Sequence, residues 1–538
     1  MLSAPQLDVG TQGCKVLAYC TATGAVVGRG SAPYPLAHPR PGAAEQDPEA
    51  WLLGLERAVA AALAGLDASR VAAVAVSGQQ HGLVVVDASG KARAARAPSR
   101  LLQRRWLSRP CRRVSRRLTR APQVLRPAKL WCDTEAAAEA AALSAATGVA
   151  TPPGFTAPKI MWLKAREPAV FAATAHVLLP HDYVNFVLTG VACCEASDAS
   201  GTGVFDAAAR RFDAAACAFV DARLLGPSGD TRGGGPDALL PRLAEGPEAV
   251  IGAVTAAAAQ RFGIPAGCAV AVGGGDNAMA ALGAGAVASG RLVCSLGTSG
   301  TLFGRADAAV RDASGCVAPF CDAAGGWLPL LCTQNCTGPA AEVRAAFGLS
   351  HEAAEEAAAA AIAARPAGAP AEPPLVFLPY LTGERTPNWP AASGALLGLR
   401  PGSLAPGPLY AAAVDGAVLA LRYGAERMRA AGGPAAAELL LVGGAAVSPL
   451  WRAALADAMQ LPVRAAAEAE AAALGAALQA AAALAAQGGA AVTVQSYVAQ
   501  HAPPPGDDVT VPDASKKAYY DAAFAHFTAA GEALFGKA

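Results

Sequence analysis

The stretch Gly273-Gly274-Gly275-Asp276-Asn277-Ala278 decides the fold prediction for this chain. It follows Ala269–Val272, a run of small and β-branched residues that is typical of a buried strand. Glycine lets the backbone turn sharply and approach another group closely, and a helical pattern of small residues begins at Ala278. The Asp276 carboxylate, at the end of a strand, is therefore a candidate to accept a proton from a substrate. The alternative is that Asp276 caps the helix that begins near Ala278.

Two short glycine turns resemble each other although they lie in opposite halves of the chain. One is Gly10-Thr11-Gln12-Gly13, and the other is Gly297-Thr298-Ser299-Gly300. Each is flanked by apolar residues that predict a strand, a tight turn and a second strand. Such a turn can direct backbone N–H groups and a Thr hydroxyl at a phosphate, while Asp8 can hold a metal-bound water. An ordinary hairpin is the alternative for either turn alone, but two of them predict a duplicated fold with a nucleotide between the halves.

A polar insert separates two apolar runs near residue 80. Val71–Val76 reads as a buried strand, and Leu83–Asp87 reads as the next one. Between them lies Ser77-Gly78-Gln79-Gln80-His81-Gly82. His81 is either a structural histidine with satisfied hydrogen bonds, which is the commoner case, or a donor to a sugar hydroxyl at the strand end.

Apolar periodicity predicts most of the remaining elements. The helix Pro48–Leu63 places Trp51, Leu52, Leu55, Val59 and Ala62 on one face. Asp133 or Thr134 is expected to cap the helix Glu135–Ala145. A strand over Glu438–Val442 is expected to lead into Gly443-Gly444, with a helix that ends at Met459. Further helices are predicted to begin within Gly154–Leu163, to run from Leu178–Tyr183 to Thr189, and to cover Glu468–Ala486 and Lys516–Phe535.

Composition bounds the class of protein. With 538 residues, 53% hydrophobic and 16% charged, the chain reads as a globular protein of two or more domains. It has no run of eighteen strongly apolar residues, so we expect no membrane span. Its 13 cysteines include no paired CxxC spacing, so we expect reduced thiols. The start lacks a signal or transit peptide and leaves almost no strand before Asp8, so we expect the true N-terminus to be missing.

An arginine-rich segment stands apart from the rest. Twelve arginines and no acidic residue lie between Arg93 and Arg126, so the formal net charge of +1 hides an acidic body. That body gives no reason to propose nucleic-acid binding. Pro110 interrupts the helical pattern of the segment, and we interpret residues 92–123 as a disordered insertion, such as an unspliced intron carried into the gene model. The alternative is an arm that binds an anionic surface or RNA.

The order of motifs resembles the FGGY carbohydrate kinases, and within that family the xylulokinases. The matching pieces run in the family's order over nearly the whole chain. They are LDVGTQGCK, SGQQHGLVVVD, LWCDT, GFTAPKIMWLK, SDASGTGVFD, GGGDNA, SLGTSGTLF, FLPYLTGERTPNWP, GGAAVSPLWRAALAD and EAAALGAA.

This resemblance implies an α/β fold with two ribonuclease-H-like (actin-like ATPase) domains flanking a catalytic cleft. We expect the first domain at residues 1–288, with the sugar site and the first phosphate loop. We expect the second at residues 289–538, with the second phosphate loop and the adenosine site. The implied reaction is ATP-dependent phosphorylation of D-xylulose to D-xylulose 5-phosphate, with ATP and Mg²⁺ as cofactors.

The resemblance also implies roles for individual residues. Asp276 falls on the family's catalytic base, and the implied sugar contacts are Gln80, His81, Asp276 and Asn277. The implied nucleotide contacts are Asp8, Thr11, Gln12, Lys15, Gly297, Thr298, Gly444 and Ser448. Asp8 is the implied metal site. The adenosine loop departs from many relatives in having Ala445 where a third glycine is common and Val447 where lysine is common.

Other readings stay open at this point. Another FGGY kinase would act on ribulose, glycerol or gluconate. A non-catalytic, actin-like ATP-binding protein would keep the phosphate turns but would not need the Gln80-His81 dipeptide. We expect a small-molecule sugar and ATP as partners, no nucleic acid and no membrane, with a homodimer as an open alternative to a monomer. The expected location is the cytoplasm, or an organelle if the N-terminus is incomplete.

Overall fold

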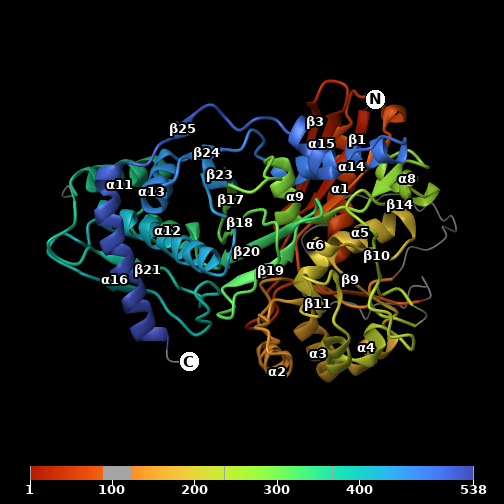
Figure 1. Ribbon diagram of the computed structural model, residues 1–538, viewed down its shortest axis with the longest axis horizontal. Helices are drawn as coiled ribbons and strands as arrows, with labels where there is room; N and C mark the ends of the chain where they lie inside the picture. The colour runs from red at the N-terminus through yellow and green to blue at the C-terminus, as the bar shows by residue number, and fades with distance from the viewer. Residues whose placement is uncertain (1, 89–122, 236, 366–367, 537–538) are drawn as a thin grey trace, which may run out of the picture.

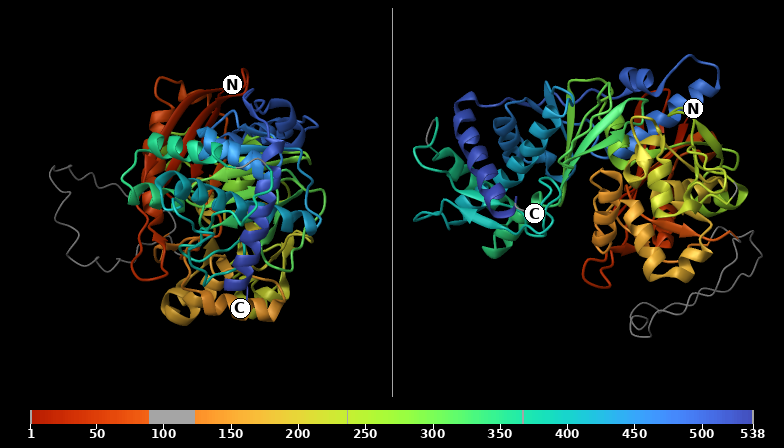
Figure 2. Two further views of the ribbon diagram at one scale, coloured as in Figure 1. Left: turned by 90° about the vertical axis from the view of Figure 1, so that its left-hand side faces the viewer. Right: turned by 60° about the horizontal axis from the view of Figure 1, so that its bottom comes forward.

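Two mixed β-sheets, one from each half of the chain, organise the fold. The computed structural model describes residues 2–88, 123–235, 237–365 and 368–536, so most of the arginine-rich segment predicted as an insertion lies outside the described residues. Figure 1 places the first half of the chain on the right, in red to yellow, and most of the second half on the left. The right-hand view of Figure 2 separates these two lobes.

The two sheets share one topology. The first has the order β16-β6-β1-β2-β3, and the second has the order β19-β20-β18-β17-β23-β24-β25. In the first, β1, β2 and β3 form an antiparallel meander, and β6 and β16 then extend the sheet in parallel with β1. In the second, β17, β18 and β20 form the meander, and β23 and β24 extend it in parallel. The predicted pair of ribonuclease-H-like domains is therefore confirmed.

The strands of the first sheet are β1 (Leu2–Val9), β2 (Gly13–Cys20), β3 (Ala25–Pro33), β6 (Val76–Gly78) and β16 (Gly274–Gly275). Those of the second are β17 (Arg291–Leu296), β18 (Gly300–Phe303), β19 (Val317–Cys321), β20 (Trp327–Thr333), β23 (Glu438–Val442), β24 (Val463–Ala465) and β25 (Val509–Thr510). Short strands pair as β4 (Glu45–Gln46) with β8 (Ala128–Lys129), β7 (Val84–Val86) with β9 (His176–Leu178), β10 (Cys193–Cys194) with β13 (Arg242–Leu243), β11 (Phe205–Asp206) with β12 (Arg211–Phe212), β15 (Ala269–Ala271) with β14 (Val250–Ala253) and β5 (Ala73–Val74), and β21 (Val376–Leu378) with β22 (Ala395–Leu397).

The first strand is longer than its sequence predicts. Pairing with β2 extends β1 back to Leu2, so the expectation of almost no strand before Asp8 is wrong. The polar Gln6 is fully buried there. Its Nε2 donates to the Ala73 carbonyl at 3.3 Å, and its Oε1 accepts from the Ala75 N–H at 2.8 Å. The side chain thus pairs with a neighbouring backbone, which is what makes a buried polar residue tolerable in a central strand.

The helices follow the apolar periodicity closely. In the first lobe they are α1 (Pro48–Ala62), α2 (Ala137–Thr147), α3 (Thr156–Arg166), α4 (Pro168–Ala173), α5 (Pro180–Thr189), α6 (Ala196–Ala199), α7 (Ala214–Val220), α8 (Ala256–Phe262) and α9 (Asp276–Gly283). The rest are α10 (Thr337–Ala346), α11 (His351–Ala363), α12 (Pro406–Ala430), α13 (Pro449–Met459), α14 (Ala471–Gln487), α15 (Val494–His501) and α16 (Lys517–Phe535).

One predicted helix cap is wrong. The residue before α2 is Ala136, which makes no side-chain capping bond. The Asp133 carboxylate instead accepts from the Ala44 N–H at 3.0 Å and from Lys129 Nζ at 2.7 Å. The other oxygen of Asp133 accepts from the Glu135 N–H at 3.2 Å, but α2 begins only at Ala137, so Asp133 stands too far before the helix to cap it.

One segment near the end of the chain, α14 with α15, returns to the first lobe. In Figure 1, α14 and α15 lie beside β1 and β3 and away from the other blue elements, and α14 packs on α9 and β1. The two helices touch through glycine: a Cβ on Gly475 would lie 1.8 Å from the Met279 carbonyl oxygen, and one on Gly283 would lie 1.9 Å from that of Ala471. Backbone-to-backbone contact therefore joins α9, which begins at Asp276, to the C-terminal half of the chain.

A hairpin of the second sheet also reaches across. The turn between β19 and β20 contacts the first lobe, and both strands appear in green at the centre of Figure 1. Arg210 Nη2 donates to the Gly326 carbonyl at 2.5 Å, and Trp327 Nε1 donates to the Ala207 carbonyl at 3.0 Å. The Cys321 N–H donates to Ser200 Oγ at 3.0 Å. This hairpin brings Phe320 against the first lobe.

Two compositional expectations have structural counterparts. Within the described parts of the chain, no helix combines the length and apolarity needed to cross a bilayer. The cysteines in those parts are all free thiols, as the absence of paired spacing predicts.

Candidate functional site

Three parallel strands of the first sheet end side by side. Gly78 of β6 pairs with Val9 of β1 on one side and with Gly275 of β16 on the other. The carboxyl ends of adjacent parallel strands share one edge of the sheet, and ligands of α/β proteins commonly bind there. Asp8, the Gln79–His81 insert and Asp276 are therefore gathered at one edge.

Asp276 is the first residue of α9 rather than its N-cap. The N-cap position is Gly275, so the capping interpretation of Asp276 is wrong. Its Oδ1 accepts from the Asn277 N–H at 2.8 Å and from Asn277 Nδ2 at 2.9 Å. Burial raises the pKa of this half-buried carboxyl to about 8, and the nearby carboxyls of Asp8 and Asp198 act in the same direction. Proton affinity of this size suits a general base near neutral pH.

The glycine turn before Asp276 behaves as the sequence predicts. Gly273 has a φ of 76°, which favours glycine, and a Cβ there would lie 2.2 Å from the Val76 carbonyl oxygen. The close approach lets the chain cross β6 and re-enter the sheet as β16. It delivers Asp276 to the edge where β1 and β6 end.

Asn277 connects three parts of the molecule. Its Nδ2 donates to Gln80 Oε1 at 3.1 Å, and its Oδ1 accepts from Thr301 Oγ1 at 3.0 Å. Gln80 follows β6 of the first lobe, while Thr301 belongs to β18 of the second. The predicted residues Gln80, Asp276 and Asn277 are thus brought together, next to a strand of the second lobe.

His81 is a neutral imidazole with an assigned tautomer. Its buried ring places Nδ1 2.8 Å from the Gly201 carbonyl, an acceptor, so Nδ1 carries the proton. Burial lowers the pKa of His81 well below its ordinary value, and the cations Arg385 and Lys159 add to the effect. Nε2 is then left with a lone pair. Nε2 can therefore accept a hydrogen bond but has no N–H to donate, in contrast to the donor role expected from the sequence.

The backbone of His81 is held in an uncommon conformation. Its φ is 65°, in the left-handed region, which costs energy for a residue with a Cβ. Its carbonyl accepts from Thr156 Oγ1 at 3.1 Å and from Lys159 Nζ at 2.9 Å. Lys159 is fully buried, and burial lowers the pKa of its ammonium to about 7. Two donors from α3 thus fix the direction in which the imidazole faces.

The first glycine turn is the tight hairpin expected from the sequence. The Gly10 N–H donates to the Gly13 carbonyl at 3.1 Å. Asp8, just before it, accepts from Ser77 Oγ at 2.7 Å. Burial raises the pKa of Asp8 to about 6, although Ser77 and Lys15 act against that rise. Asp8 is therefore a carboxylate at neutral pH, close to a second acid, Asp276.

The remaining predicted residues of this turn have different surroundings. Thr11 Oγ1 donates to Gln79 Oε1 at 3.1 Å and accepts from Trp131 Nε1 at 2.9 Å. The Gln12 side chain is exposed. Lys15 pairs with Glu470 at 2.5 Å, so a residue just before α14 neutralises the cation of the turn. Thr11 is thus a hydroxyl already engaged within the first lobe, while Gln12 and Lys15 stay accessible.

The second glycine turn lies beside the loop after β23. The Gly297 carbonyl accepts from Thr337 Oγ1 at 2.9 Å, and Thr298 is exposed. Gly443 and Gly444 are exposed as well, and a Cβ on Gly443 would lie 2.8 Å from the Leu296 carbonyl oxygen. The structure therefore brings Gly297, Thr298 and Gly444 to one edge of the second sheet.

The Ser448 hydroxyl caps a helix. Its Oγ accepts from the Trp451 N–H at 3.3 Å and so caps α13. The same hydroxyl donates to Glu355 Oε1 at 2.6 Å. Ser448 fixes the end of the glycine loop, whereas Val447 beside it has 81% of its surface exposed.

One cluster of acids has the spacing of a metal site but a different role. Among the described residues, the carboxylates of Glu45, Asp133 and Glu135 are the group whose ligand atoms lie within 4.8 Å of one another. Lys129 Nζ contacts Asp133 at 2.7 Å and Glu135 at 2.5 Å, and Arg126 contacts Glu45 at 2.7 Å. The acids are therefore neutralised by bases, and the cluster is a buried ion-pair network.

Three residues around His81 received no role from the sequence. Phe155 stacks on the imidazole with ring centroids 4.5 Å apart, and Phe320 of the second lobe lies 5.8 Å from it. Arg385, also from the second lobe, holds its guanidinium 5.2 Å from the centroid of the Phe155 ring. The motif around Arg385 was visible in the sequence, but its spacing from residue 155 carries no information about contact.

Models of a known protein family match both halves of the chain. The model of the FGGY family of carbohydrate kinases, N-terminal domain, matches residues 4–94 and 118–283. The model of the C-terminal domain of the same family matches residues 292–484. The segment between residues 94 and 118 interrupts the first match, in the arginine-rich region.

Individual relatives are similar over nearly their whole length. A xylulose kinase from Haemophilus influenzae is 33% identical over 488 residues, which cover 88% of this chain and 89% of the relative. A xylulose kinase from Streptomyces coelicolor is 36% identical over 483 residues, which cover 88% of this chain and 86% of the relative. A crystal structure described as a xyloylose kinase from Brucella ovis superposes with a TM-score of 0.80 at 29% identity and 99% coverage of both chains.

Proposed function

The chain belongs to the FGGY family of carbohydrate kinases, and on that premise we propose that it phosphorylates D-xylulose at O5, with Asp276 as the general base. The substrate assignment is supported by xylulose kinases that match most of the chain. The observation that carries the base assignment is the Asp276 carboxyl, which begins α9 at the same sheet edge as Asp8 and Gln80.

The proposed step conserves atoms and charge. The Asp276 carboxylate accepts the O5 proton while O5 forms a bond to the γ-phosphorus of ATP. The bond between that phosphorus and the bridging oxygen to the β-phosphate breaks, and ADP leaves. Such transfers need in-line positioning and charge neutralisation more than covalent help. A carboxyl with a pKa of about 8 has the proton affinity that this role requires.

The sugar contacts follow from donor and acceptor chemistry. We assign Gln80, His81, Asp276 and Asn277 to the sugar. His81 Nε2 accepts from one hydroxyl, since Nδ1 is committed to the Gly201 carbonyl. Asn277 holds Gln80 and Thr301 at the same time, so it sets the distance between the sugar site and the strand of the second lobe.

Nucleotide binding is assigned to both glycine turns. We propose that Asp8, Thr11, Gln12 and Lys15 face the phosphates from the first lobe and that Gly297 and Thr298 face them from the second. We assign Gly444 and Ser448 to the adenosine side. The accessible backbone at Gly444 and the exposed Val447 side chain support that side, because an adenine ring packs well against small and apolar groups.

Asp8 fits a magnesium ion chemically. Mg²⁺ prefers oxygen ligands, keeps several waters, and is commonly bound by one or two carboxylates together with substrate phosphates. Asp8 is a carboxylate near a second acid, and Ser77 and Lys15 stabilise its charged form. We propose that Asp8 holds Mg²⁺ through a bound water, and when bound the ion neutralises phosphate charge.

We also propose the domain division at residue 288. The last strand of the first sheet, β16, precedes it, and the first strand of the second sheet, β17, follows it, which supports the boundary. Residues 471–501 belong to the second segment by sequence but pack on the first sheet. We further propose a cytoplasmic location and a homodimer, which cell fractionation and light scattering test.

A coupled assay tests the proposed reaction. ADP release is measured with D-xylulose, D-ribulose, glycerol and D-gluconate as acceptors, and the product is examined by ³¹P NMR. We expect kcat/KM for D-xylulose to exceed the others by about tenfold or more, with the phosphate on C5. A preference for glycerol or gluconate would reject the substrate assignment. Absence of acceptor-dependent ADP release would point to a non-catalytic ATP-binding protein.

A further inference from the structure

Arg385 is a cation of the second lobe that reaches into the sugar site of the first. Its half-exposed guanidinium lies 5.2 Å from the centroid of the Phe155 ring, just before α3. Phe155 in turn stacks on His81, with ring centroids 4.5 Å apart and an interplanar angle of 18°. The charge of Arg385 also acts on the imidazole of His81 and on Lys159. Arg385 therefore shares one environment with a proposed sugar contact.

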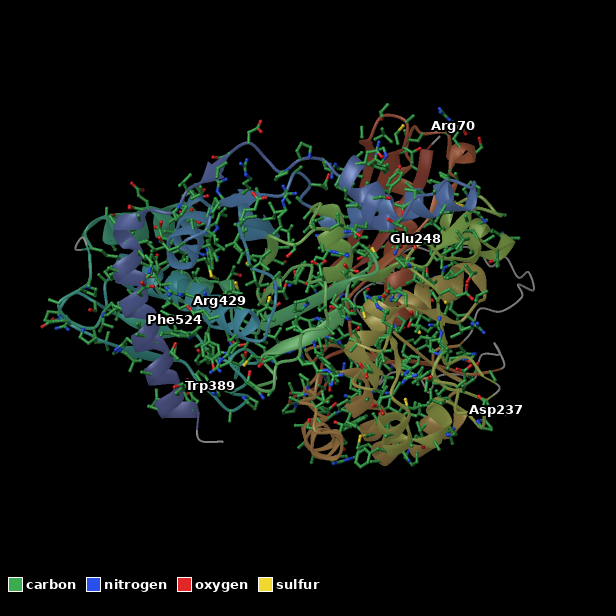
Figure 3. All side chains as sticks on the ribbon, in the orientation of Figure 1. Arg70, Asp237, Glu248, Trp389, Arg429 and Phe524 are labelled. Carbon is green, nitrogen blue, oxygen red and sulfur yellow. The ribbon has the colours of Figure 1, made fainter. Side chains whose placement is uncertain are left out.

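The loop that carries Arg385 is firmly held by its own lobe. Glu384, which has 1% of its surface exposed, accepts from the Gln334 N–H at 2.6 Å and the Arg385 N–H at 2.7 Å. At the other end of the loop, Trp389 packs against Phe535 of α16 with centroids 6.1 Å apart, and Figure 3 labels Trp389 near the lower end of α16. These anchors aim the Arg385 side chain away from its own core.

The guanidinium has donors to spare. Among the described residues, no carboxylate lies within ion-pair distance of Arg385, and its side chain donates no hydrogen bond. Arg422 shows the contrast: it lies over the Phe524 ring at 4.4 Å and also pairs with Asp521 at 2.7 Å. His81 and Lys159, on which the charge of Arg385 acts, carry no negative charge that could pair with it. The guanidinium presents its N–H donors as a planar fork. A ligand with two adjacent oxygen acceptors could accept hydrogen bonds from both sides of that fork.

The position of Arg385 selects one end of the substrate. A chain of contacts runs from Asp276 through Asn277 to Gln80, and then through His81 and Phe155 to Arg385. In the proposed reaction Asp276 takes the proton of the reacting hydroxyl, and we place the opposite end of the sugar towards Arg385. A 2-ketopentose with a free O5 must be in its open-chain form, because its furanose ring would contain O5. That form leaves a C2 ketone beside a C1 hydroxyl.

We propose that Arg385 donates its guanidinium N–H groups to the C1 hydroxyl and C2 ketone oxygens of the open-chain ketose. The inference rests on the proposed function and adds to it the residue that recognises the α-hydroxyketone. The planar fork suits two oxygens on neighbouring carbons, and both are acceptors. His81 offers the opposite polarity, because its Nε2 accepts from a hydroxyl.

Binding without nucleotide provides the direct test. Calorimetry compares D-xylulose with 1-deoxy-D-xylulose, which keeps the ketone but lacks the C1 oxygen. In the wild type we expect the second sugar to bind about tenfold more weakly, as for a lost bond to a charged donor. In Arg385→Met we expect D-xylulose to lose about tenfold or more in affinity and the difference between the two sugars to shrink to about twofold.

Two further variants make the test specific. Arg385→Lys keeps the charge but not the fork, so we expect it to recover only part of the affinity and little of the selectivity. Arg422→Met removes a guanidinium that also lies over an aromatic ring, beside the labelled Phe524 in Figure 3, and it should leave ketose affinity unchanged. Thermal unfolding of each variant checks that it is folded.

The outcomes separate this inference from the proposed function. A wild type that neither binds nor phosphorylates D-xylulose overturns the proposed function and this inference together. A wild type active on D-xylulose whose Arg385→Met variant keeps its affinity, or loses it equally for both sugars, overturns the inference alone. A fall in kcat with unchanged KM for the ketose would also overturn it, because Arg385 would then act on the transferring phosphoryl group.

Discussion

The Asp276 carboxyl is partly accessible, but its surroundings disfavour the charged form. The carboxyl is half-buried, and burial together with Asp8 and Asp198 raises its pKa to about 8. The two bonds from Asn277 oppose that rise. An acid that holds its proton this strongly is a better base once it is ionised, so residue-scale electrostatics connect directly to the proposed proton transfer.

Replacing that carboxyl tests its role. We expect Asp276→Asn to lower kcat by about a hundredfold to ten-thousandfold, which is the usual value of general-base help, while KM for the ketose changes little. Steady-state kinetics with D-xylulose measure both. Asp307→Asn is the control, since its side chain is 78% exposed. Near-normal turnover in Asp276→Asn would remove the base assignment.

The pH dependence of the reaction has a defined sign. Asp276 must be ionised to accept a proton, and its pKa is about 8. We therefore expect kcat/KM to fall about tenfold per pH unit below that value and to level off above it. A pH–rate profile between pH 6 and 9 measures this. A flat profile across that range would contradict the raised pKa.

Stability should change with pH in the opposite direction. The pKa of Asp276 rises from 3.8 to about 8 on folding, so the folded state binds this proton more tightly than the unfolded state. The resulting stabilisation is complete below about pH 4 and is lost as the pH rises towards 8. We expect Asp276→Asn to raise Tm by about 2–4 °C at pH 8.5 and less at pH 5. Calorimetric melts measure the difference, and a lower Tm at pH 8.5 would refute it.

At the scale of elements, the crossing of α9 and α14 is the tightest contact that bears on the site. Gly283 and Gly475 let the two backbones touch, and α9 carries Asp276 on its first turn. The turn of β19 and β20 adds a second fixed connection, through Arg210 and Trp327. Both contacts join segments far apart in the chain, so the position of Asp276 depends on the second half of the sequence.

A methyl group at this crossing should be costly. In Gly475→Ala the new Cβ would lie 1.8 Å from the Met279 carbonyl oxygen, so the helices must move apart. We expect a loss of about 1–3 kcal/mol or more in the free energy of unfolding, as for other overpacked sites. Denaturant titration measures it. Gly338→Ala is the matched control, because a Cβ in that helix meets only Thr298 at 4.0 Å and alanine favours helix. Equal stability of the two variants would contradict the argument.

At the scale of the whole molecule, the arginine-rich segment enters and leaves at neighbouring points. The Asp87 N–H donates to the Gln123 carbonyl at 3.1 Å, and Val86 forms a bridge with Val124. The family match stops at residue 94 and resumes at residue 118. The ends of the segment are thus already paired as the ends of a hairpin would be, next to β7.

Removing the segment tests whether the catalytic fold needs it. We expect replacement of residues 88–122 by a two-residue Asn-Gly turn to close the hairpin and to stabilise the fold by about 1–2 kcal/mol through a shorter loop. Since the proposed site residues lie outside the segment, kcat/KM for D-xylulose should stay within about twofold. Kinetics and thermal melts of the shortened chain measure both. Loss of folding or of activity would show that the fold or the reaction requires the segment.

Much of the fold could be predicted from local pattern. The strand over Glu438–Val442, the helix ending at Met459 and both glycine hairpins occur where the apolar periodicity and the turn residues predict them. The exceptions are local competitions that the pattern does not reveal. Asp133 lies too far before α2 to cap it and pairs with Lys129 instead, and pairing with β2 extends β1 through polar residues.

The sequence by itself determined the strand over Glu438–Val442, the two glycine hairpins and the placement of Asp276 after a glycine turn, because each depends on residues close together in the chain. Only the tertiary structure decided that His81 Nδ1 lies at the Gly201 carbonyl, that burial raises the pKa of Asp276 to about 8, and that Arg385 faces Phe155. Those properties depend on contacts between residues far apart in the chain, and the burial and charge that such contacts produce exist only after the chain has folded.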